Sequence, residues 1–541
     1  MLFNSYEFIL AFLPAAIAGF LLFGMTSRTL ALAWLIVASI FFYAWWRPFN
    51  LLIIGPSVIV NFIFARILLR LARDESQPRL RAFVLALGIL FNVALLSYFK
   101  YANFAVTIAS DLTGGNFVLE QIILPLGISF ITFQKIAFLV DVAGRRVETF
   151  TTRDFLLFVL FFPQLIAGPI VHFREIVPQF HQATCRFNAE MFAAALTLFC
   201  FGLFKKVVLA DGVAQYVSPV FAFAAAGEPV TLVQAWLAAV GFTLQIYFDF
   251  SGYTDMACGA ALFFGIRLPL NFDSPLKASS IIDFWLRWHV TLTRFLTAYI
   301  YNPIALALSR RRAARGQSML SGRGSTVSAF FHVLAGPILV TMLVSGAWHG
   351  AGYTFILWGL LHGFYLIVNH LWRQYGPRSA DGKGAGAHFA SLTGFALTFL
   401  LVVCGMVLFR AADLASAVNV MKGLVGLHGV GLPSRLAEIL RMPSLAPMMQ
   451  LDGEVHMRTF AIAAAYVVGL LVIALFLPNS LQVISKYEPA LRIPKRPPKL
   501  AGVGPPIYWR PTLPWMVLIA VLAALAMMQL TGKSEFLYWQ F

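Results

Sequence analysis

The sequence predicts an all-α, polytopic membrane protein, and three features of the chain support this fold class. Hydrophobic residues make up 60% of its 541 positions and charged residues only 12%, whereas an ordinary soluble domain has about 25% charged residues. The mean hydropathy is +0.80. Apolar runs of roughly 17 to 25 residues, each long enough to cross a bilayer, recur from end to end. We therefore expect lipid to be the outer solvent.

Thirteen apolar segments are expected to be helices, at 8–26, 30–46, 50–71, 82–109, 122–143, 154–170, 190–208, 230–264, 328–346, 352–372, 390–410, 457–477 and 512–531. No segment alternates as the strands of a membrane barrel do, and only helices and closed barrels satisfy backbone groups in lipid. We predict one integral membrane domain over residues 1–541, with about 11 to 13 transmembrane helices. The first run lacks the basic n-region of a cleaved signal peptide and is expected to be retained.

Charge between the apolar runs predicts the topology. The net charge is +17, but the Lys and Arg residues sit in short clusters between helices, as the positive-inside rule requires, which argues against nucleic-acid binding. The loop around 111–120 has no Lys or Arg and is expected outside, with the N-terminus also outside. By parity, 411–456 is an external connection, either a docking surface or a passive lid. Residues 485–511 form a basic cytoplasmic loop before the last helix.

The stretch from 267 to 303 does not fit a simple membrane span. Prolines interrupt it, and its charged side chains include Asp273, Lys277, Asp283, Arg287 and Arg294. Irregular or charged backbone at membrane depth must be enclosed by protein or line a wet cavity. We expect a re-entrant or interfacial segment here.

His349 is the strongest candidate for chemistry. It lies in Ser345-Gly346-Ala347-Trp348-His349-Gly350-Ala351-Gly352-Tyr353, a glycine-rich break between two apolar runs, with Trp348 and Tyr353 flanking it. Glycines let the backbone break and approach a substrate closely. An ionisable group within membrane segments is by default a functional-site hypothesis, because burying it is costly. The alternative is a histidine that only packs between helices.

A second candidate is His289, which follows Asp283, Arg287 and Trp288 in Asp283-Phe-Trp-Leu-Arg-Trp-His289. Asp283 and Arg287 are four residues apart and can pair on a helix. A neighbouring histidine could be tuned or oriented by that pair. An aromatic-rich interfacial anchor explains the same residues equally well. His362 is expected to pack between helices.

A polar island interrupts the apolar run at 230–264. It contains Asp249, Tyr253 and Asp255, which need partners inside the protein. Such acids could relay protons, or they could hold the charged segment at 267–303 through Arg287 or Arg294. We favour the structural role, since six residues put the two carboxylates on different helix faces.

Several chemistries have no support in the sequence. No GxSxG elbow, Walker loop, HExxH or CxxC pair occurs, and the four cysteines have neither metal nor disulfide spacing. No metal and no bound cofactor are expected. A histidine acting as general base on a substrate hydroxyl or thiol fits better.

Six segments stand out in order along nearly the whole chain: Leu124 to Phe130 (LPLGISF), Phe161 to Ile170 (FFPQLIAGPI), Gln245 to Asp255 (QIYFDFSGYTD), Phe284 to His289 (FWLRWH), Gly346 to Ala351 (GAWHGA) and Phe536 to Phe541 (FLYWQF). Together they resemble the membrane-bound O-acyltransferase superfamily, and the bacterial alginate O-acetyltransferase branch in particular. The resemblance is specific because it depends on ordered matches and not on a single motif.

That resemblance implies a ring of helices around a central catalytic pore. It places His349 at the family's catalytic histidine and His289 at its second characteristic position. It further implies a donor that is acetyl-CoA or another acyl thioester, a polysaccharide acceptor such as alginate or cellulose, a periplasmic partner protein, and a bacterial inner membrane location. Ser345-Gly346-Ala347 replace larger or basic residues of the family, which affects the expected width of the tunnel.

Two other functions remain open from the sequence. One is D-alanyl transfer to a teichoic acid-type polymer. The other is a polysaccharide transporter or export channel, which broken helices and intramembrane acids would also suit. The absence of an inverted internal repeat counts against the transporter.

Overall fold

The computed structural model describes residues 1–74, 76–120, 122–319, 326–376, 385–432, 457–492 and 507–530, without the side chains of 385–388 and 457. Within these ranges the regular elements are helices, and the isolated β-bridge there pairs Pro269 with Leu491. The predicted all-α fold class is confirmed. The closing segment Phe536–Phe541, residues 433–456 of the external connection and 493–506 of the basic loop lie outside the described residues.

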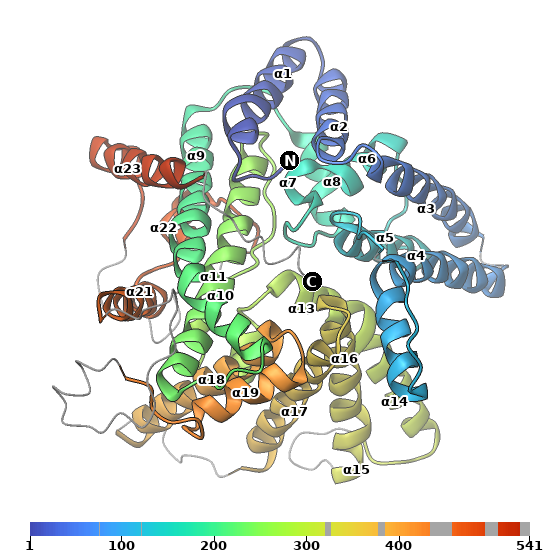
Figure 1. Cartoon of the computed structure of the whole chain (residues 1–541). Coiled ribbons are helices and arrows are strands. Elements are labelled where there is room, and N and C mark those ends of the chain that lie inside the picture. The colour runs from blue at the N-terminus through green and yellow to red at the C-terminus, as the bar shows by residue number, and fades with distance from the viewer. Residues whose placement is uncertain are drawn as a thin grey trace.

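The N-terminal part consists of long helices followed by short ones (Figure 1). These elements are η1, a π-helical turn (Glu7–Phe12), α1 (Leu13–Thr26), α2 (Arg28–Ala44), α3 (Asn50–Arg73), α4 (Pro78–Thr113), α5 (Ile128–Ala143), α6 (Thr152–Leu160), α7 (Phe162–Leu165) and α8 (Phe173–Gln182). Helices α1 and α2 pack as a hairpin, and α5 packs against both α3 and α4.

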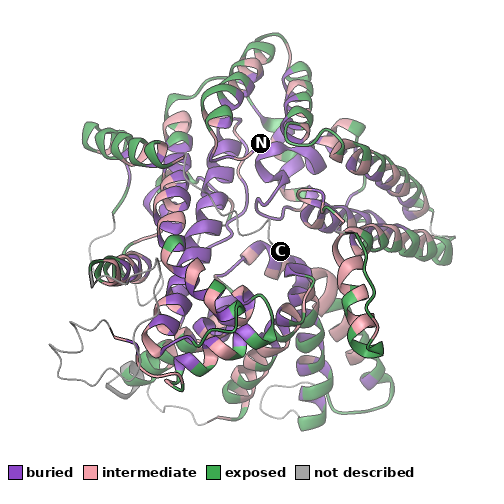
Figure 2. Ribbon diagram, in the orientation of Figure 1, coloured by how far each residue is buried: buried purple, intermediate pink, exposed green. Residues whose placement is uncertain are grey.

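A central group of helices follows, namely α9 (Ala189–Phe204), the π-helical turn η2 (Lys205–Ala210), α10 (Asp211–Ala225) and α11 (Leu232–Leu262). A capping box between Thr231 and Gln234 starts α11. Every residue from Gly241 to Leu262 is buried, and Figure 2 shows this group as the most buried part of the molecule, with exposed faces on the outer helices. Helix α11 is therefore the axis against which α9 and α10 pack.

The interrupted stretch is irregular and largely buried, as its prolines and charges predict. It contains η3 (Pro275–Lys277), α12 (Ile281–Trp285), α13 (Val290–Leu296) and η4 (Thr297–Tyr301), and it leads into α14 (Asn302–Ala314). Its extended start is tied to the basic loop by the backbone hydrogen bonds from Leu270 N–H to Leu491 O (3.0 Å) and from Leu491 N–H to Leu268 O (2.8 Å).

The C-terminal part comprises α15 (Val327–Phe330), η6 (Phe331–Ala335), α16 (Gly336–His349), α17 (Tyr353–Tyr375), α18 (Ala385–Arg410), α19 (Leu414–Leu424), α21 (Met457–Phe476), α22 (Ser480–Val483), η7 (Ser485–Tyr487) and α23 (Leu513–Gln529). Helices α16 and α17 pack along each other, and α17 also packs against α18. Helix α19 forms the first part of the predicted external connection and packs on α10 and α11.

Eight helices of the described chain are long and apolar enough to cross a membrane, and α2 and α23 are shorter apolar helices. The protein is therefore a multi-pass membrane protein. The sequence predicted a larger number of spans. One reason for the difference is α11, which was expected to be a span but carries buried carboxylates and contacts protein along most of its length.

Two predicted helices are wrong in their bounds. The expected helix at 154–170 is broken at Phe161 between α6 and α7, because Pro163 cannot continue α6. The helix expected from 122 begins at Ile128, since Gly127 adopts a left-handed φ of 71° that suits a turn and not a helix interior. After Gly168-Pro169 the chain forms α8.

Helices α9 and α11 approach so closely that glycine is required at their crossing. A Cβ atom on Gly202 would lie 2.5 Å from the carbonyl oxygen of Gly252, and one on Gly252 would lie 2.7 Å from that of Gly202. Small residues that let backbones meet are a common basis of helix association in membranes. This contact fixes α9 and η2 against the buried part of α11.

We predict that Gly202→Ala lowers the stability of the protein by about 1–3 kcal/mol, because the added methyl group overpacks the crossing. Thermal unfolding in detergent should show a lower Tm. Gly469→Ala on α21 is the matched control, since a Cβ there meets nothing within 4 Å. Equal Tm values for the two variants would contradict the close-approach argument.

Candidate active site

His349 is the last residue of α16, and the chain becomes extended at Gly350. Its side chain is buried, at 4% exposure. Helix α16 reaches this position by a close crossing with α17. A Cβ on Gly346 would overlap the carbonyl oxygen of Phe355, and one on Gly359 would overlap that of Met342. Gly346 of the sequence motif and Gly359 of α17 thus let the two helices meet closely near the end of α16, where the histidine lies.

Aromatic rings enclose His349. The ring centroids of Trp348, Trp358 and Phe409 lie 4.9, 5.1 and 5.1 Å from that of His349. The fourth ring is His289, whose centroid lies 6.3 Å away. The two histidines that the sequence selected, 60 positions apart, therefore meet in one apolar, buried environment.

Lys100 and Tyr101 of α4 bind the free carbonyl groups at the end of α16. The Lys100 ammonium donates to the carbonyl oxygens of Trp348 and His349, the latter at 3.2 Å. The Tyr101 hydroxyl donates to the carbonyl oxygen of Ala347 at 2.6 Å. The last carbonyls of a helix have no intrahelical partner and attract positive charge. These contacts anchor the helix end that carries His349.

His289 is fully buried and is held by Asn271. Its Nδ1 atom lies 3.0 Å from Asn271 Oδ1. It adopts a left-handed φ of 44° and precedes α13 directly. A bulky residue in this conformation is strained unless the surrounding structure enforces it, and such residues cluster at functional sites.

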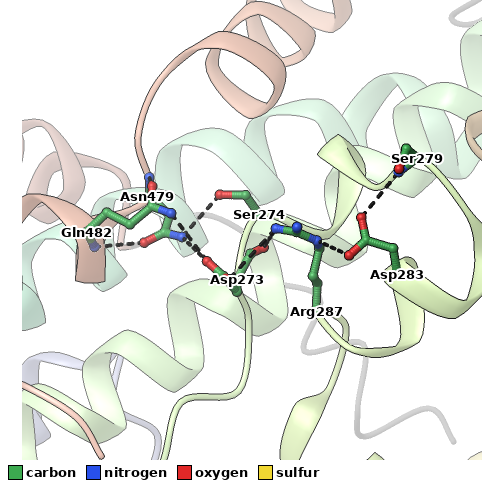
Figure 3. Close-up of polar contacts among 7 residues, drawn as sticks. All are labelled: Asp273, Ser274, Ser279, Asp283, Arg287, Asn479 and Gln482. Carbon is green, nitrogen blue, oxygen red and sulfur yellow. Dashed lines mark hydrogen bonds and ion pairs between the residues drawn. The ribbon is translucent and has the colours of Figure 1, made fainter. Parts of the chain in front are cut away.

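The expected influence of Asp283 and Arg287 on His289 is wrong in this structure, because Asn271 is its polar partner. The two residues do pair on α12, with Arg287 Nε 2.8 Å from Asp283 Oδ1. Arg287 also approaches Asp273 Oδ2 at 3.8 Å. Figure 3 shows that this network runs through Asp273 to Asn479 and Gln482.

The network joins the interrupted stretch to the start of α22. Asn479 Nδ2 donates to Asp273 Oδ1 at 3.3 Å and to Ser274 Oγ at 3.1 Å. Burial raises the pKa of the Asp273 carboxyl above its usual value, and the neighbouring Arg287 guanidinium opposes that shift. The network therefore connects the interrupted stretch with the start of α22, two segments that lie far apart in the sequence.

The carboxylates of the polar island have partners other than those predicted. Asp249 binds Lys206 at 2.5 Å, and Asp255 binds Lys205 at 2.6 Å. Arg287 and Arg294 pair with Asp283 and Glu175 instead, so the predicted arginine partners are wrong. Tyr253 is buried and stacks on the ring of Phe3.

A small pocket lies beside this island. It is lined by Lys205, Tyr247, Ser251, Thr254, Asp255, Phe272, Asn479, Ser480 and Leu481. Phe272 is also a ring neighbour of His289, at 6.4 Å. Through Phe272 the pocket therefore adjoins the surroundings of His289. Among the described residues, no three His, Cys, Asp or Glu side chains group as metal ligands would.

Three further residues that the sequence analysis discussed are Trp288, Tyr353 and His362. Trp288 is buried and stacks on Phe284. Tyr353 is 39% exposed, and its hydroxyl donates to Asp111 Oδ2 at 2.9 Å. His362 is fully buried on α17, 4.8 Å from the ring of Trp358, in the packing position that the sequence suggested.

Sequence reasoning missed Lys100, Asn271, Trp358 and Phe409. A signal existed for Lys100, the single charged residue within the predicted helix at 82–109, since a charge within an apolar run needs a partner inside the protein. Asn271 gave no comparable signal, because nothing in the local sequence connects it with His289.

Comparison with known proteins finds similarity to acyltransferases of membranes. The model of MBOAT, the membrane-bound O-acyltransferase family, matches residues 143–335. A peptidoglycan O-acetyltransferase of Helicobacter pylori is 38% identical over 80% of this chain and 81% of its own. A probable alginate O-acetylase of Pseudomonas aeruginosa is 36% identical over 77% of this chain and 73% of its own. A teichoic acid D-alanyltransferase of Streptococcus thermophilus is 26% identical over 52% and 68%.

We predict that Lys100→Met slows any reaction that depends on His349 by about 10- to 100-fold, because the loosened end of α16 no longer fixes the ring. Turnover per amount of folded protein is the measurement. Lys422→Met, which alters an exposed lysine of α19, is the control and should be neutral. Unchanged turnover of the Lys100 variant would show that the hydrogen bonds from Lys100 to the end of α16 do not position His349.

Proposed function

The chain belongs to the membrane-bound O-acyltransferase family and is an acyltransferase, and we propose that it transfers an acetyl group from a thioester such as acetyl-CoA to hydroxyl groups of a polysaccharide. Relatives named for O-acetylation of peptidoglycan and alginate support the acetyl group and the class of acceptor, since each covers more than three quarters of this chain. The D-alanyltransferase relative is more distant in identity and coverage.

The observation that carries this proposal is the meeting of His349 and His289, with ring centroids 6.3 Å apart. Each histidine belongs to a segment tied to a different loop. Just beyond His349, Tyr353 binds Asp111, in the loop predicted to be external. The segment of His289 is bonded to Leu491, in the loop predicted to be cytoplasmic. A site between the two suits a donor and an acceptor that arrive from opposite sides.

We assign His349 the role of general base. Its neutral imidazole accepts the proton of the acceptor hydroxyl while the hydroxyl oxygen attacks the carbonyl carbon of the thioester. The new C–O bond forms as the C–S bond breaks, and the departing thiolate takes the proton back from the imidazolium. General-base catalysis contributes about 10²–10⁴-fold.

The enclosure of His349 by Trp348, Trp358 and Phe409 supports this chemistry. A site that excludes water protects an activated thioester from hydrolysis. It also favours the neutral imidazole, because burial of a charge in an apolar environment is costly. Both effects favour transfer to the acceptor over transfer to water.

The proposal places the protein in the bacterial inner membrane, where the donor is available on the cytoplasmic side. A separate periplasmic protein would complete delivery of the acetyl group to the polymer, with α19 and the predicted external connection as its contact region. The donor is a substrate, and we propose no resident cofactor. D-alanyl transfer to a teichoic acid-type polymer is the second candidate, favoured by the D-alanyltransferase relative.

We predict that His349→Ala abolishes acetylation of the polymer, because the general base is lost, while the protein stays folded in the membrane. Polymer-bound acetyl and the Tm in detergent are measured together. The control is His332→Ala, which alters an exposed histidine at the start of the same membrane helix and should leave both unchanged. Retained acetylation in the His349 variant would overturn the mechanism.

The donor is tested by feeding membranes a radiolabelled acetyl thioester or radiolabelled D-alanine. We expect label on the polymer from the acetyl donor alone, and none in the His349→Ala membranes. Label from D-alanine would replace the acetyl assignment with the second candidate.

We predict that His289→Ala slows acetyl transfer by about 10²-fold without abolishing it, since the base remains but its neighbouring imidazole is lost. The initial rate of transfer is the measurement. A rate equal to that of the unaltered protein would show that His289 has no role in transfer and acts only as an aromatic anchor.

A further inference from the structure

We propose that Asn271 is a positioning residue that fixes His289 in one tautomer, with the proton on Nδ1 and an unprotonated Nε2 offered to a hydroxyl of the polysaccharide next to the one that reacts. The inference rests on the proposed acetyl transfer and adds a role for a residue in the loop between α11 and η3. It follows from the hydrogen bonds around Asn271, from the burial of His289 and from the backbone that holds both.

The orientation of the Asn271 amide is set by its neighbours. Its Oδ1 atom accepts hydrogen bonds from the Thr291 N–H at 3.3 Å and from the Thr291 hydroxyl at 2.8 Å. A backbone N–H only donates, so the atom that faces it is the oxygen. On the other side, Nδ2 donates to Thr254 Oγ1 at 3.4 Å. The amide thus has its oxygen towards α13 and its nitrogen towards α11.

This orientation decides the tautomer of His289. Because Asn271 Oδ1 is an acceptor, the imidazole nitrogen 3.0 Å from it must be the donor. In the neutral ring one nitrogen donates and the other accepts. Nδ1 therefore carries the proton, and Nε2 keeps its lone pair.

The surroundings of His289 favour the neutral ring. The side chain is fully buried, and its ring contacts come from α11 (Phe250), the loop after α11 (Phe272) and α16 (Trp348 and His349). His349 is the titratable group among these contacts. These described ring contacts are apolar or imidazole and include no carboxylate, which disfavours the imidazolium.

The Nε2 atom of His289 is buried and has no hydrogen-bond partner within the described protein. A buried polar atom without a partner is costly and is rare outside functional sites. A neighbouring hydroxyl of the bound polysaccharide would donate to Nε2 and so hold the reacting hydroxyl, whose single proton goes to His349, against the thioester. The substrate would then supply the partner that the protein lacks.

The backbone holds the arrangement rigidly. The Val290 N–H donates to the carbonyl oxygen of Asn271 at 2.9 Å, so Asn271 binds both the side chain of His289 and the peptide that follows it. This pair of contacts stabilises the left-handed φ of 44° at His289. Strain of this kind persists only where several interactions enforce it.

The test is the pH dependence of transfer by Asn271→Asp, assayed as label from acetyl-CoA in detergent-solubilised membranes. A carboxylate can still accept hydrogen bonds from Thr291 and from His289, so the fold should be retained. An adjacent negative charge favours the imidazolium by about 1–3 pH units. Nε2 then becomes protonated at higher pH, and the acidic limb of the rate profile should move up by that amount.

Asn92→Ala is the matched control. Asn92 is equally buried and bonds to Asn61 between α3 and α4, so it reports the loss of a buried amide elsewhere in the protein. Its pH profile should coincide with that of the unaltered chain. A coincident profile for Asn271→Asp would overturn the inference. If His349→Ala meanwhile abolishes transfer, the proposed function stands and the role of Asn271 alone fails.

A double-mutant cycle keeps the inference testable if the aspartate variant does not fold. Asn271→Ala should slow transfer in the unaltered protein but cost little further in a His289→Ala background, because Asn271 acts through His289. The rate is normalised to folded protein. Additive losses would show that Asn271 acts independently of His289 and would overturn the inference.

Discussion

The ion pairs that Lys205 and Lys206 of η2 make with Asp255 and Asp249 of α11 are the interactions on which the centre of the molecule depends. Helix α11 is buried along its second half, and a carboxylate there without a cation would be very costly. Lys206 also binds Asp211, at the start of α10. The three helices α9, α10 and α11 are thus joined by charge as well as by the glycine crossing, and the loop that carries Asn271 starts from this fixed axis.

The candidate active site depends on that axis from one side and on α4 from the other. Asn271 follows α11 and holds His289, while Lys100 of α4 holds the end of α16 and with it His349. In the described part of the chain, Asn271 and Lys100 fix the two histidines through amide and backbone contacts. An acid in hydrogen-bond contact would stabilise the imidazolium, whereas an amide or a carbonyl orients the ring and leaves it neutral. This arrangement suits a base that must begin the reaction uncharged.

The comparisons and the structure emphasise different parts of the chain. The family match covers residues 143–335 and so includes His289 but ends before His349. The peptidoglycan and alginate O-acetylation relatives align with more than three quarters of the chain. Those relatives are named for different polymers. In the proposed mechanism, polymer choice depends on surfaces outside the two histidines, since any polymer hydroxyl attacks the thioester in the same way.

The sequence by itself determined the helical membrane class and most helix positions, and it selected the two histidines as candidates, because apolar runs, glycine breaks and buried ionisable groups are local properties of the chain. It also determined the Asp283–Arg287 pair, since four residues on a helix span one turn. Only the tertiary structure decided which distant groups meet. Asp249 pairs with Lys206 and not with an arginine, His289 bonds to Asn271, and Lys100 caps a helix almost 250 residues away. Such pairings depend on how helices cross in space, and helical periodicity within one segment carries no information about that.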